Sequence, residues 1–278
     1  MAIGTRTNIG TTQSTAESTT ISLSTIAAVS SGDTIVVASL SRNSSGAAAT
    51  LSDSAGNTYA LAVSDYSAVR TTSFALHFVA NALALSSGQT LTIEWTTTVA
   101  VNQKAVSAFK VSGITTSTAA LDATGTATGQ STTPSVTSGG TVQADELVVG
   151  AVAFRDNGTV FTQDSSYATP PVEIYSPTSA GVAQARNIGG GNLVATSTAT
   201  FTYAPEVGST LLWIAMIATF TAATSTGAEA ALAGHGLLLG RSRNKLAFTG
   251  MRERVPEHLS CQSVGHALPL PSGFVISP

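Results

Sequence analysis

The chain has little of several residue types on which particular functions depend. Cysteine occurs once, at Cys261, so the chain has no second cysteine for a disulfide and cannot build a thiolate zinc site from cysteine alone. Charged residues make up 10% of the 278 positions, against about 25% in an ordinary soluble domain. The net charge is −3 and the sequence pI is near 5.7, which argues against nucleic acid or an anionic membrane as the main partner.

Long apolar runs are also missing. The longest one, residues 211–218, is far shorter than the ~20 residues that a membrane-spanning helix needs. The first residues lack the basic start and apolar stretch of a secretory signal. Two explanations stay open: a particle that is assembled in the cytoplasm and released by lysis, or a mature fragment whose signal has been removed.

Serine and threonine are abundant and together account for more than a quarter of the chain, while 43% of the residues are hydrophobic. That hydrophobic share is enough to bury a core, so the chain is not of the disordered type. Threonine on outward-facing strand positions combines high β-propensity with an uncharged surface. The composition is more typical of a structural or binding β-protein than of an enzyme.

Short β-branched runs between Gly, Asn, Asp and Ser clusters predict an all-β fold. The strongest strand signals are residues 34–40, 72–79, 90–95, 105–111, 146–154, 198–203 and 210–218. Leu91, Ile93 and Trp95 alternate with polar residues and should face a core, and Trp213 is assigned to the core as well. Residues 35–40 and 147–154 are apolar on both faces, which predicts central strands that are covered on each side.

Turns and chain ends complete the predicted organisation. Turns are expected at residues 54–57, 156–158 and 189–192, where Gly and Asn tolerate positive φ. Residues 1–20 are predicted to be an irregular Thr/Ser-rich arm, 21–223 a β-sandwich domain, and 224–278 a linker and basic tail. Residues 241–278 hold five of the twelve Lys and Arg residues; this tail is either an anchor that docks on a partner or a disordered end.

A weak internal repeat is visible in three segments. Residues 33–40 match 145–152, residues 90–95 match 198–203, and residues 105–111 resemble 213–219, each about 110 positions apart. Two similar sets of strands predict a single antiparallel double-sheet sandwich of jelly-roll or Greek-key type with a pseudo-repeat. Two separate small domains are the alternative, and the absence of a Pro-rich hinge favours one domain.

The order of these strand and turn motifs resembles a known family. The motifs are Gly32-Asp-Thr-Ile-Val-Val, Leu51-Ser-Asp-Ser-Ala-Gly-Asn-Thr-Tyr59, Phe109-Lys-Val-Ser-Gly113, Leu121-Asp122, Ala144-Asp-Glu-Leu-Val-Val-Gly150 and Ile217-Ala-Thr-Phe220. Together they resemble a β-sandwich module shared by bacterial secreted or surface proteins and tailed-phage structural proteins. The resemblance implies a display or attachment role and brings no shared catalytic residues.

Candidate catalytic groups are sparse. Gly-x-Ser-x-Gly does not occur, and His77 is the one histidine before residue 235. His77 is either a general base beside Asp65 or Asp53, or a plain strand residue at the surface or in a polar pocket. Asp145 and Glu146 are adjacent, so on a strand they point to opposite faces and cannot flank one bond. The sequence therefore predicts that the protein is not an enzyme.

Metal and cofactor signals are equally weak. The turns at residues 53–57 and 156–158 lack the acidic density of a calcium loop, and residues 187–192 lack the Gly-Lys-Ser/Thr ending of a phosphate-binding loop. His258, Cys261 and His266 match no standard metal-site spacing. No metal and no cofactor are predicted.

Four tyrosines lie in or near predicted turns and are the candidate ligand-facing residues: Tyr59, Tyr66, Tyr167 and Tyr175. An exposed tyrosine can stack on a sugar, but tyrosines also rim sandwich cores with the hydroxyl in water. Both interpretations stay open on the sequence.

The function predicted from the sequence is that of a non-enzymatic virion structural protein of a tailed phage, either a capsid decoration or a head or tail appendage. Low charge leaves little repulsion between copies, which favours a homo-oligomer in contact with other virion proteins at the virion surface. The alternative is a bacterial cell-surface or secreted module for adhesion or carbohydrate binding, with surface glycans as partners. A hydrolase built on His77 is a residual third hypothesis.

Overall fold

The computed structural model describes residues 2–42, 49–67, 71–96, 102–140, 144–155, 161–168, 174–175 and 186–224. This part of the chain is built of antiparallel β-strands with one short 3-10 helix, Thr118–Ala120, which confirms the predicted all-β class. None of the helical structure in this part is long or apolar enough to cross a membrane. The predicted linker and basic tail, residues 224–278, lie outside the described residues except for Thr224, as does the predicted turn at 156–158.

The first half of the chain forms two sheets. A five-stranded sheet, which we call the N-terminal large sheet, has the order β1 (Thr7–Ser14), β8 (Asn102–Val111), β3 (Thr34–Arg42), β6 (Thr72–Val79) and β5 (Ala60–Ser67). A three-stranded sheet, the N-terminal small sheet, has the order β2 (Thr20–Ser24), β7 (Thr90–Trp95) and β4 (Ala49–Asp53).

The second half has a corresponding arrangement. The C-terminal large sheet has the order β13 (Ile174–Tyr175), β14 (Arg186–Val194), β11 (Leu147–Arg155), β17 (Leu211–Phe220) and β9 (Leu121–Ser131). Two strand pairs form what we call the C-terminal cover: β10 (Val136–Gly140) with β15 (Thr200–Tyr203), and β12 (Phe161–Thr162) with β16 (Glu206–Val207).

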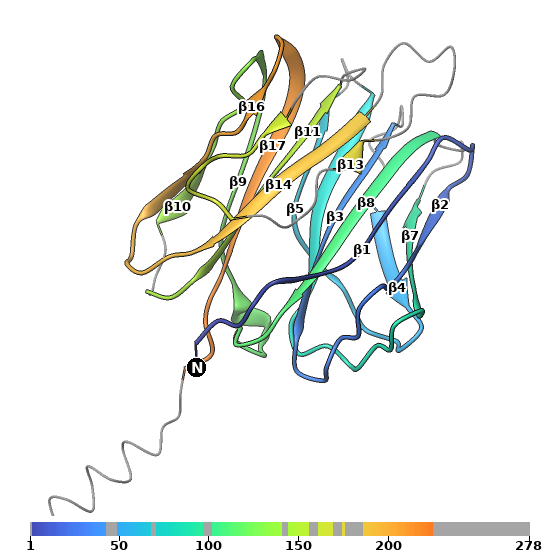
Figure 1. Ribbon diagram of the computed structural model, residues 1–278, viewed down its shortest axis with the longest axis vertical. Coiled ribbons are helices and arrows are strands. Elements are labelled where there is room, and N and C mark those ends of the chain that lie inside the picture. The colour runs from blue at the N-terminus through green and yellow to red at the C-terminus, as the bar shows by residue number, and fades with distance from the viewer. Residues whose placement is uncertain are drawn as a thin grey trace, which may run out of the picture. The chain divides into compact units, whose positions relative to one another are not determined.

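Strand alternation divides the apolar residues among three cores. In β3, Val36, Ala38 and Leu40 enter a central core that both large sheets share. Ile35 and Val37, which point the other way, enter a core with the N-terminal small sheet. A third core lies between the C-terminal large sheet and its cover. The layers therefore run from the small sheet through the two large sheets to the cover (Figure 1).

Several predictions about the core are confirmed. The strands β3 and β11 are buried on both faces along nearly their whole length, because each lies in the middle of a large sheet between two cores. Trp95 and Trp213 are 2% and 7% exposed. The single two-layer jelly-roll is not confirmed, because the two large sheets pack face to face and add layers to the sandwich.

The predicted irregular arm needs correction. Residues Thr7–Ser14 form β1, which pairs with β8 at the edge of the N-terminal large sheet, and Ile9 is fully buried. A bulge between Asn8 and Gly10 shifts the register. The segment escaped prediction because Thr and Gly occupy most of its inward positions, which leaves no apolar alternation to detect.

The predicted turn at residues 189–192 is also wrong. These residues lie inside β14 and pair with β11 from Val149 to Val152. A Cβ atom at Gly189 would overlap the ring of Phe161 in the C-terminal cover, and one at Gly191 would overlap the side chain of Gln163. A run of glycines therefore marked a closely covered strand instead of a turn.

The sequence repeat agrees with the structure in one segment of three. Trp95 and its match Tyr203 both face the core under a small sheet or cover. Val36, however, faces the central core, whereas its match Val148 faces the C-terminal core. A shift of one residue reverses the face of every side chain in a strand. The repeat as aligned in the sequence is therefore not confirmed, although the strand orders of the two large sheets correspond.

Candidate functional site

His77 lies on β6 between the N-terminal large and small sheets. It is 3% exposed, and its Nε2 lies 3.1 Å from the carbonyl oxygen of Ala49 on β4. The hydrogen bond places the proton of the neutral ring on Nε2, and the buried Nδ1 has no hydrogen-bond partner. Burial lowers the pKa of His77 to about 4, so the ring is neutral at pH 7.

The structure does not bring His77 together with either predicted acidic partner. Asp65 is paired with Phe74, which faces the central core, so it lies on the opposite side of the sheet from His77. Its Oδ2 accepts a 2.6 Å hydrogen bond from Thr126 of β9. Asp53 lies four residues beyond Ala49 on β4, or about 13 Å along the strand. His77 therefore acts here as a buried link between two sheets.

Asp53 organises the turn that follows β4. Its carboxylate accepts hydrogen bonds from the backbone N–H groups of Ala55 and Asn57. It also accepts from Asn57 Nδ2 at 2.8 Å and from the Tyr59 hydroxyl at 2.8 Å. An aspartate that binds its own turn in this way is a turn-forming residue. Among the described residues, no group of three His, Cys, Asp or Glu side chains is placed to hold a metal ion.

The four candidate tyrosines do not form one surface. Tyr59 is bound to Asp53, and burial together with the neighbouring carboxylate raises its pKa. Tyr167 is 4% exposed, lies edge-on to Tyr203, and donates to the carbonyl of Thr202 at 3.0 Å, so it belongs to the C-terminal core and not to a ligand-facing surface. Tyr66 is half-buried on β5. Tyr175 is in β13, and its side chain lies outside the described residues.

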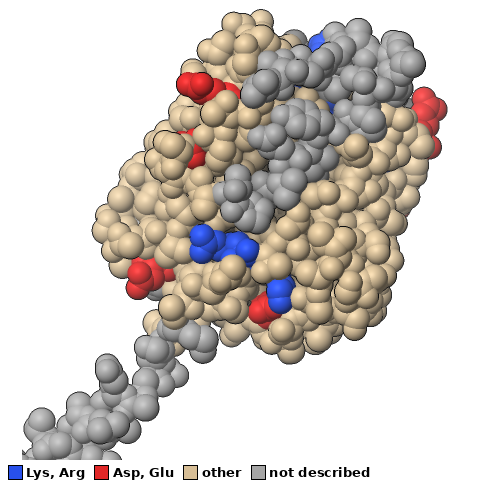
Figure 2. Space-filling model, in the orientation of Figure 1, with Lys and Arg blue, Asp and Glu red and all other residues tan. Residues whose placement is uncertain are grey.

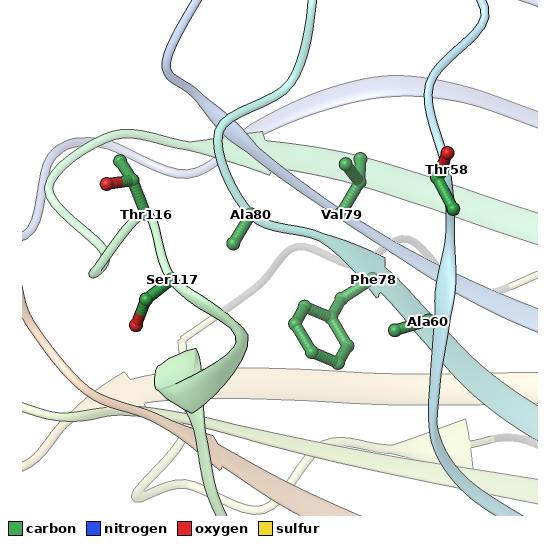
Figure 3. Close-up of a pocket in the computed structure, with 7 residues that line it drawn as sticks. All are labelled: Thr58, Ala60, Phe78, Val79, Ala80, Thr116 and Ser117. Atoms are coloured by element: carbon green, nitrogen blue, oxygen red, sulfur yellow. The ribbon is translucent and has the colours of Figure 1, made fainter.

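A small cavity lies at the end of β6 (Figure 3). Its volume is about 190 Å³, and Phe78, Ala60 and Ser117 are among its lining residues. Ligand pockets usually measure about 300–1,000 Å³. Ionisable side chains are absent from the lining, which consists of Thr58, Ala60, Phe78, Val79, Ala80, Thr116 and Ser117. The cavity therefore offers neither the room nor the groups that catalysis needs.

The outward face of the N-terminal small sheet carries a regular array of hydroxyl groups. The cross-strand rows are Thr20–Glu94–Thr50, Ser22–Thr92–Ser52 and Ser24–Thr90. Apart from Thr92, which is half-buried, these residues are exposed. Neighbouring strands lie about 4.8 Å apart and alternate residues about 6.7 Å apart, so the array is dense. We call these eight residues the hydroxyl face.

The sequence carries a signal for this face. Ser or Thr occupies alternate positions of residues 20–24 and 90–92, opposite the buried Ile21, Leu23 and Leu91. The apolar half of the same alternation forms the core. Figure 2 shows a view of the molecule in which uncharged residues predominate.

Comparisons with protein-family models, with curated proteins and with solved structures found no match. The assignment of fold class consequently stands on the strand arrangement alone.

Proposed function

We propose that this protein is a non-enzymatic structural protein of a tailed-phage virion, either a capsid decoration or a head or tail appendage, that presents its β-sandwich at the particle surface. The observation that carries the proposal is the hydroxyl face, a dense and nearly uncharged array on a well-packed layered scaffold. Short neutral side chains let another surface approach closely without the desolvation cost that buried charges incur.

The scaffold itself supports a passive role. Three apolar cores hold the described strands together, and close packing of this kind gives low compressibility. The histidine that a hydrolase would use is buried and neutral at pH 7. In this proposal the hydroxyl face contacts a second copy of the chain or a neighbouring virion protein.

The test compares two triple variants of the full-length chain. Ser22→Lys/Thr92→Lys/Ser52→Lys places three like charges across one row of the hydroxyl face. Thr124→Lys/Thr128→Lys/Gln130→Lys places the same three charges at exposed positions of the edge strand β9. Light scattering and co-sedimentation with purified particles should show an oligomer or a bound protein that only the first variant disrupts.

Other results would contradict the proposal. A full-length chain that is monomeric and binds no particle contradicts it directly. A glycan-array signal that Tyr66→Ala abolishes, with no binding to particles, supports instead the carbohydrate-binding alternative. Among the three candidate tyrosines whose side chains are described, Tyr59 and Tyr167 donate their hydroxyls to other residues, which leaves Tyr66 to test.

A further inference from the structure

Few large apolar side chains are exposed in the part of the chain that the structure describes. Ile26 is 68% exposed, Leu83 53% and Leu61 47%. Ile26 lies in the loop between β2 and β3, and Leu83 lies in the loop between β6 and β7. Both loops lie at the end of the N-terminal large sheet where β3 begins and β6 ends (Figure 1).

Hydrogen bonds hold these two loops against each other. Val29 and Leu85 exchange backbone hydrogen bonds of 2.8 and 3.0 Å, and Thr25 Oγ1 donates to the carbonyl of Ser86 at 2.8 Å. Val29 and Leu85 are also members of the core under the N-terminal small sheet. Ile26 therefore projects into solvent from a loop whose backbone is fixed on both sides.

The cavity at the end of β6 lies at the same end of the sheet. Its lining residue Thr58 follows Asn57 in the chain, and Asn57 is bound to the backbone of Leu83. The N–H of Leu83 donates to Asn57 Oδ1 at 2.6 Å, and Asn57 Nδ2 donates to the Leu83 carbonyl at 3.3 Å. Leu83 thus links the cavity to the loops that carry Ile26. We call Ile26, Leu83 and the cavity together the apolar end.

The cavity has the size and the lining to accept one apolar side chain. The ring of Phe78 forms part of its wall and is held edge-on against Phe220, with the ring centroids 5.2 Å apart. The exposed residues Thr58, Thr116 and Ser117 lie on either side of Phe78 (Figure 3). An apolar cavity of about 150 Å³ binds benzene. The volume of about 190 Å³ therefore admits a side chain of the size of isoleucine.

Charge does not oppose a contact between two copies at the apolar end. The two loops, residues 25–33 and 80–89, contain one ionisable side chain, Asp33. It is 7% exposed, and Lys110 neutralises it at 3.0 Å. The cavity lining contains no ionisable side chain. Two such surfaces bring no like charges together, whereas a charged partner would meet no exposed counter-charge on these loops.

We infer that the apolar end is a contact surface between two copies of this chain, in which Ile26 of each copy enters the cavity of the other. A protruding side chain and a receiving cavity on one surface are self-complementary, and a two-fold axis between them forms both contacts at once. The inference rests neither on the hydroxyl face nor on the virion role.

The spacing of the two features suits a two-fold contact. The N–H of Ile26 donates to the carbonyl of Ile9 on β1, and the cavity lies at β6, three strands away in the order β1-β8-β3-β6. Three strand spacings amount to about 14 Å, which leaves room for the axis between Ile26 and the cavity. Leu83, which links the two, becomes buried in the contact.

The experiment is sedimentation velocity of the full-length chain at concentrations up to about 100 μM, which should show a monomer–dimer equilibrium. Ile26→Ser should weaken the dimer roughly tenfold or more, because each dimer loses both inserted side chains. Leu61→Ser is the matched control. Leu61 is also exposed, but it is paired with His77 and so lies on the other face of β5 from Ala60, which lines the cavity. This variant should dimerise like the parent chain.

A second variant fills the cavity instead of removing the side chain that enters it. Ala60 is exposed and lines the cavity, so Ala60→Phe should block the entry of Ile26 and weaken the dimer as well. A mixture of Ile26→Ser and Ala60→Phe should associate more tightly than either variant alone. In the mixed dimer one contact pairs an intact Ile26 with an intact cavity, whereas damage to the fold of either variant would not be repaired by mixing.

Three outcomes would overturn the inference: a parent chain that remains monomeric, an Ile26→Ser variant that dimerises as tightly as Leu61→Ser, or a mixture that associates no better than its components. These outcomes are separable from the test of the proposed function. The triple-lysine variant of the hydroxyl face should retain this dimer, since its charges lie on the outward face of the small sheet. A monomeric chain that binds particles overturns the inference and leaves the proposed function standing.

Discussion

The two halves of the molecule have the same strand order in their large sheets, but the large side chains that fill their cores come from different layers. Five residues before the terminal arginines of the central strands, the N-terminal large sheet pairs Val37 with His77, while the C-terminal large sheet pairs Gly150 with Gly191. A Cβ atom at Gly150 would overlap the ring of Tyr203. At this position the large sheet supplies the large side chains in the N-terminal half, whereas the cover supplies them in the C-terminal half.

This difference shows that the large side chains of a β-sandwich core can come from either of two facing layers while the strand order stays the same. Interiors are packed to nearly constant density, so a residue that becomes small in one layer requires a larger one opposite. Tyr203 and Phe161 lie over glycines in just this way. Substitutions on each side of a packed pair should therefore have different effects in the two halves.

The largest effect is expected at Tyr203, because Gly150 beneath it cannot fill the space that it leaves. Tyr203 is fully buried, and replacing a buried aromatic residue by alanine costs roughly 3–5 kcal/mol. Tyr203→Ala should therefore lower the free energy of unfolding in urea by that amount. A loss below about 1 kcal/mol would show that the cover does not supply the missing volume.

Adding volume at the facing glycine should lower the free energy of unfolding by less, and its effect should depend on whether Tyr203 is present. Gly150→Ala forces a methyl group into the Tyr203 ring and should cost about 1–3 kcal/mol by overpacking. Gly140→Ala is the matched control, because a Cβ there meets no atom within 4 Å. In the double variant Gly150→Ala/Tyr203→Ala the cost of the alanine should largely vanish. Equal effects at Gly150 and Gly140 would contradict the close packing.

His77 gives the N-terminal half a pH dependence. Its pKa falls from 6.5 to about 4 on folding, so between these values the unfolded chain binds the proton more readily than the folded chain. Stability is therefore complete above pH 6.5 and declines as the pH falls toward 4. The loss between pH 7.5 and pH 5 should be about 2 kcal/mol.

The control is His77→Gln, which keeps a donor for the Ala49 carbonyl but does not titrate. Urea unfolding at the two pH values should show that this variant loses less stability on acidification than the parent chain, by the amount assigned to the histidine. If His77→Gln loses as much stability between the two pH values as the parent chain does, the histidine is not held in the neutral state.

The smallest effects concern two tyrosines that anchor turns in opposite halves. Tyr59→Phe removes a hydrogen bond to the Asp53 carboxylate, and Tyr167→Phe removes one to the Thr202 carbonyl. The first should cost about 1.5 kcal/mol and the second about 1 kcal/mol, since hydrogen bonds to charged groups are stronger. Thermal unfolding of the two single variants checks the order, which would be wrong if Tyr167→Phe were the more damaging.

The sequence predicted strands well where apolar residues alternate or run together. Residues 72–79 and 90–95 coincide with β6 and β7, because both strands face cores that need their apolar side chains. It failed at β1 and at the glycines of β14, where the strand contributes backbone pairing and its partners contribute the bulk. A pattern read from one segment cannot show what a distant segment packs against it.

The candidate sites were harder to predict for the same reason. The alternation placed His77 opposite Leu76 and Phe78, which was correct, but not whether that face met solvent or a second sheet. Arg155 pairs with Arg186 on the neighbouring strand, and Arg186 donates a hydrogen bond to Thr72 of the other large sheet. Only the register and the layer order bring these three positions together.

The central core has a consequence for how copies of the chain can meet. Each large sheet presents to the other a face of buried apolar residues, and only a short connection after β8 precedes the second half. Each half is therefore also complementary to the opposite half of another copy. At high concentration this geometry permits exchange of halves between chains, giving an intertwined dimer whose contacts are those of the monomer.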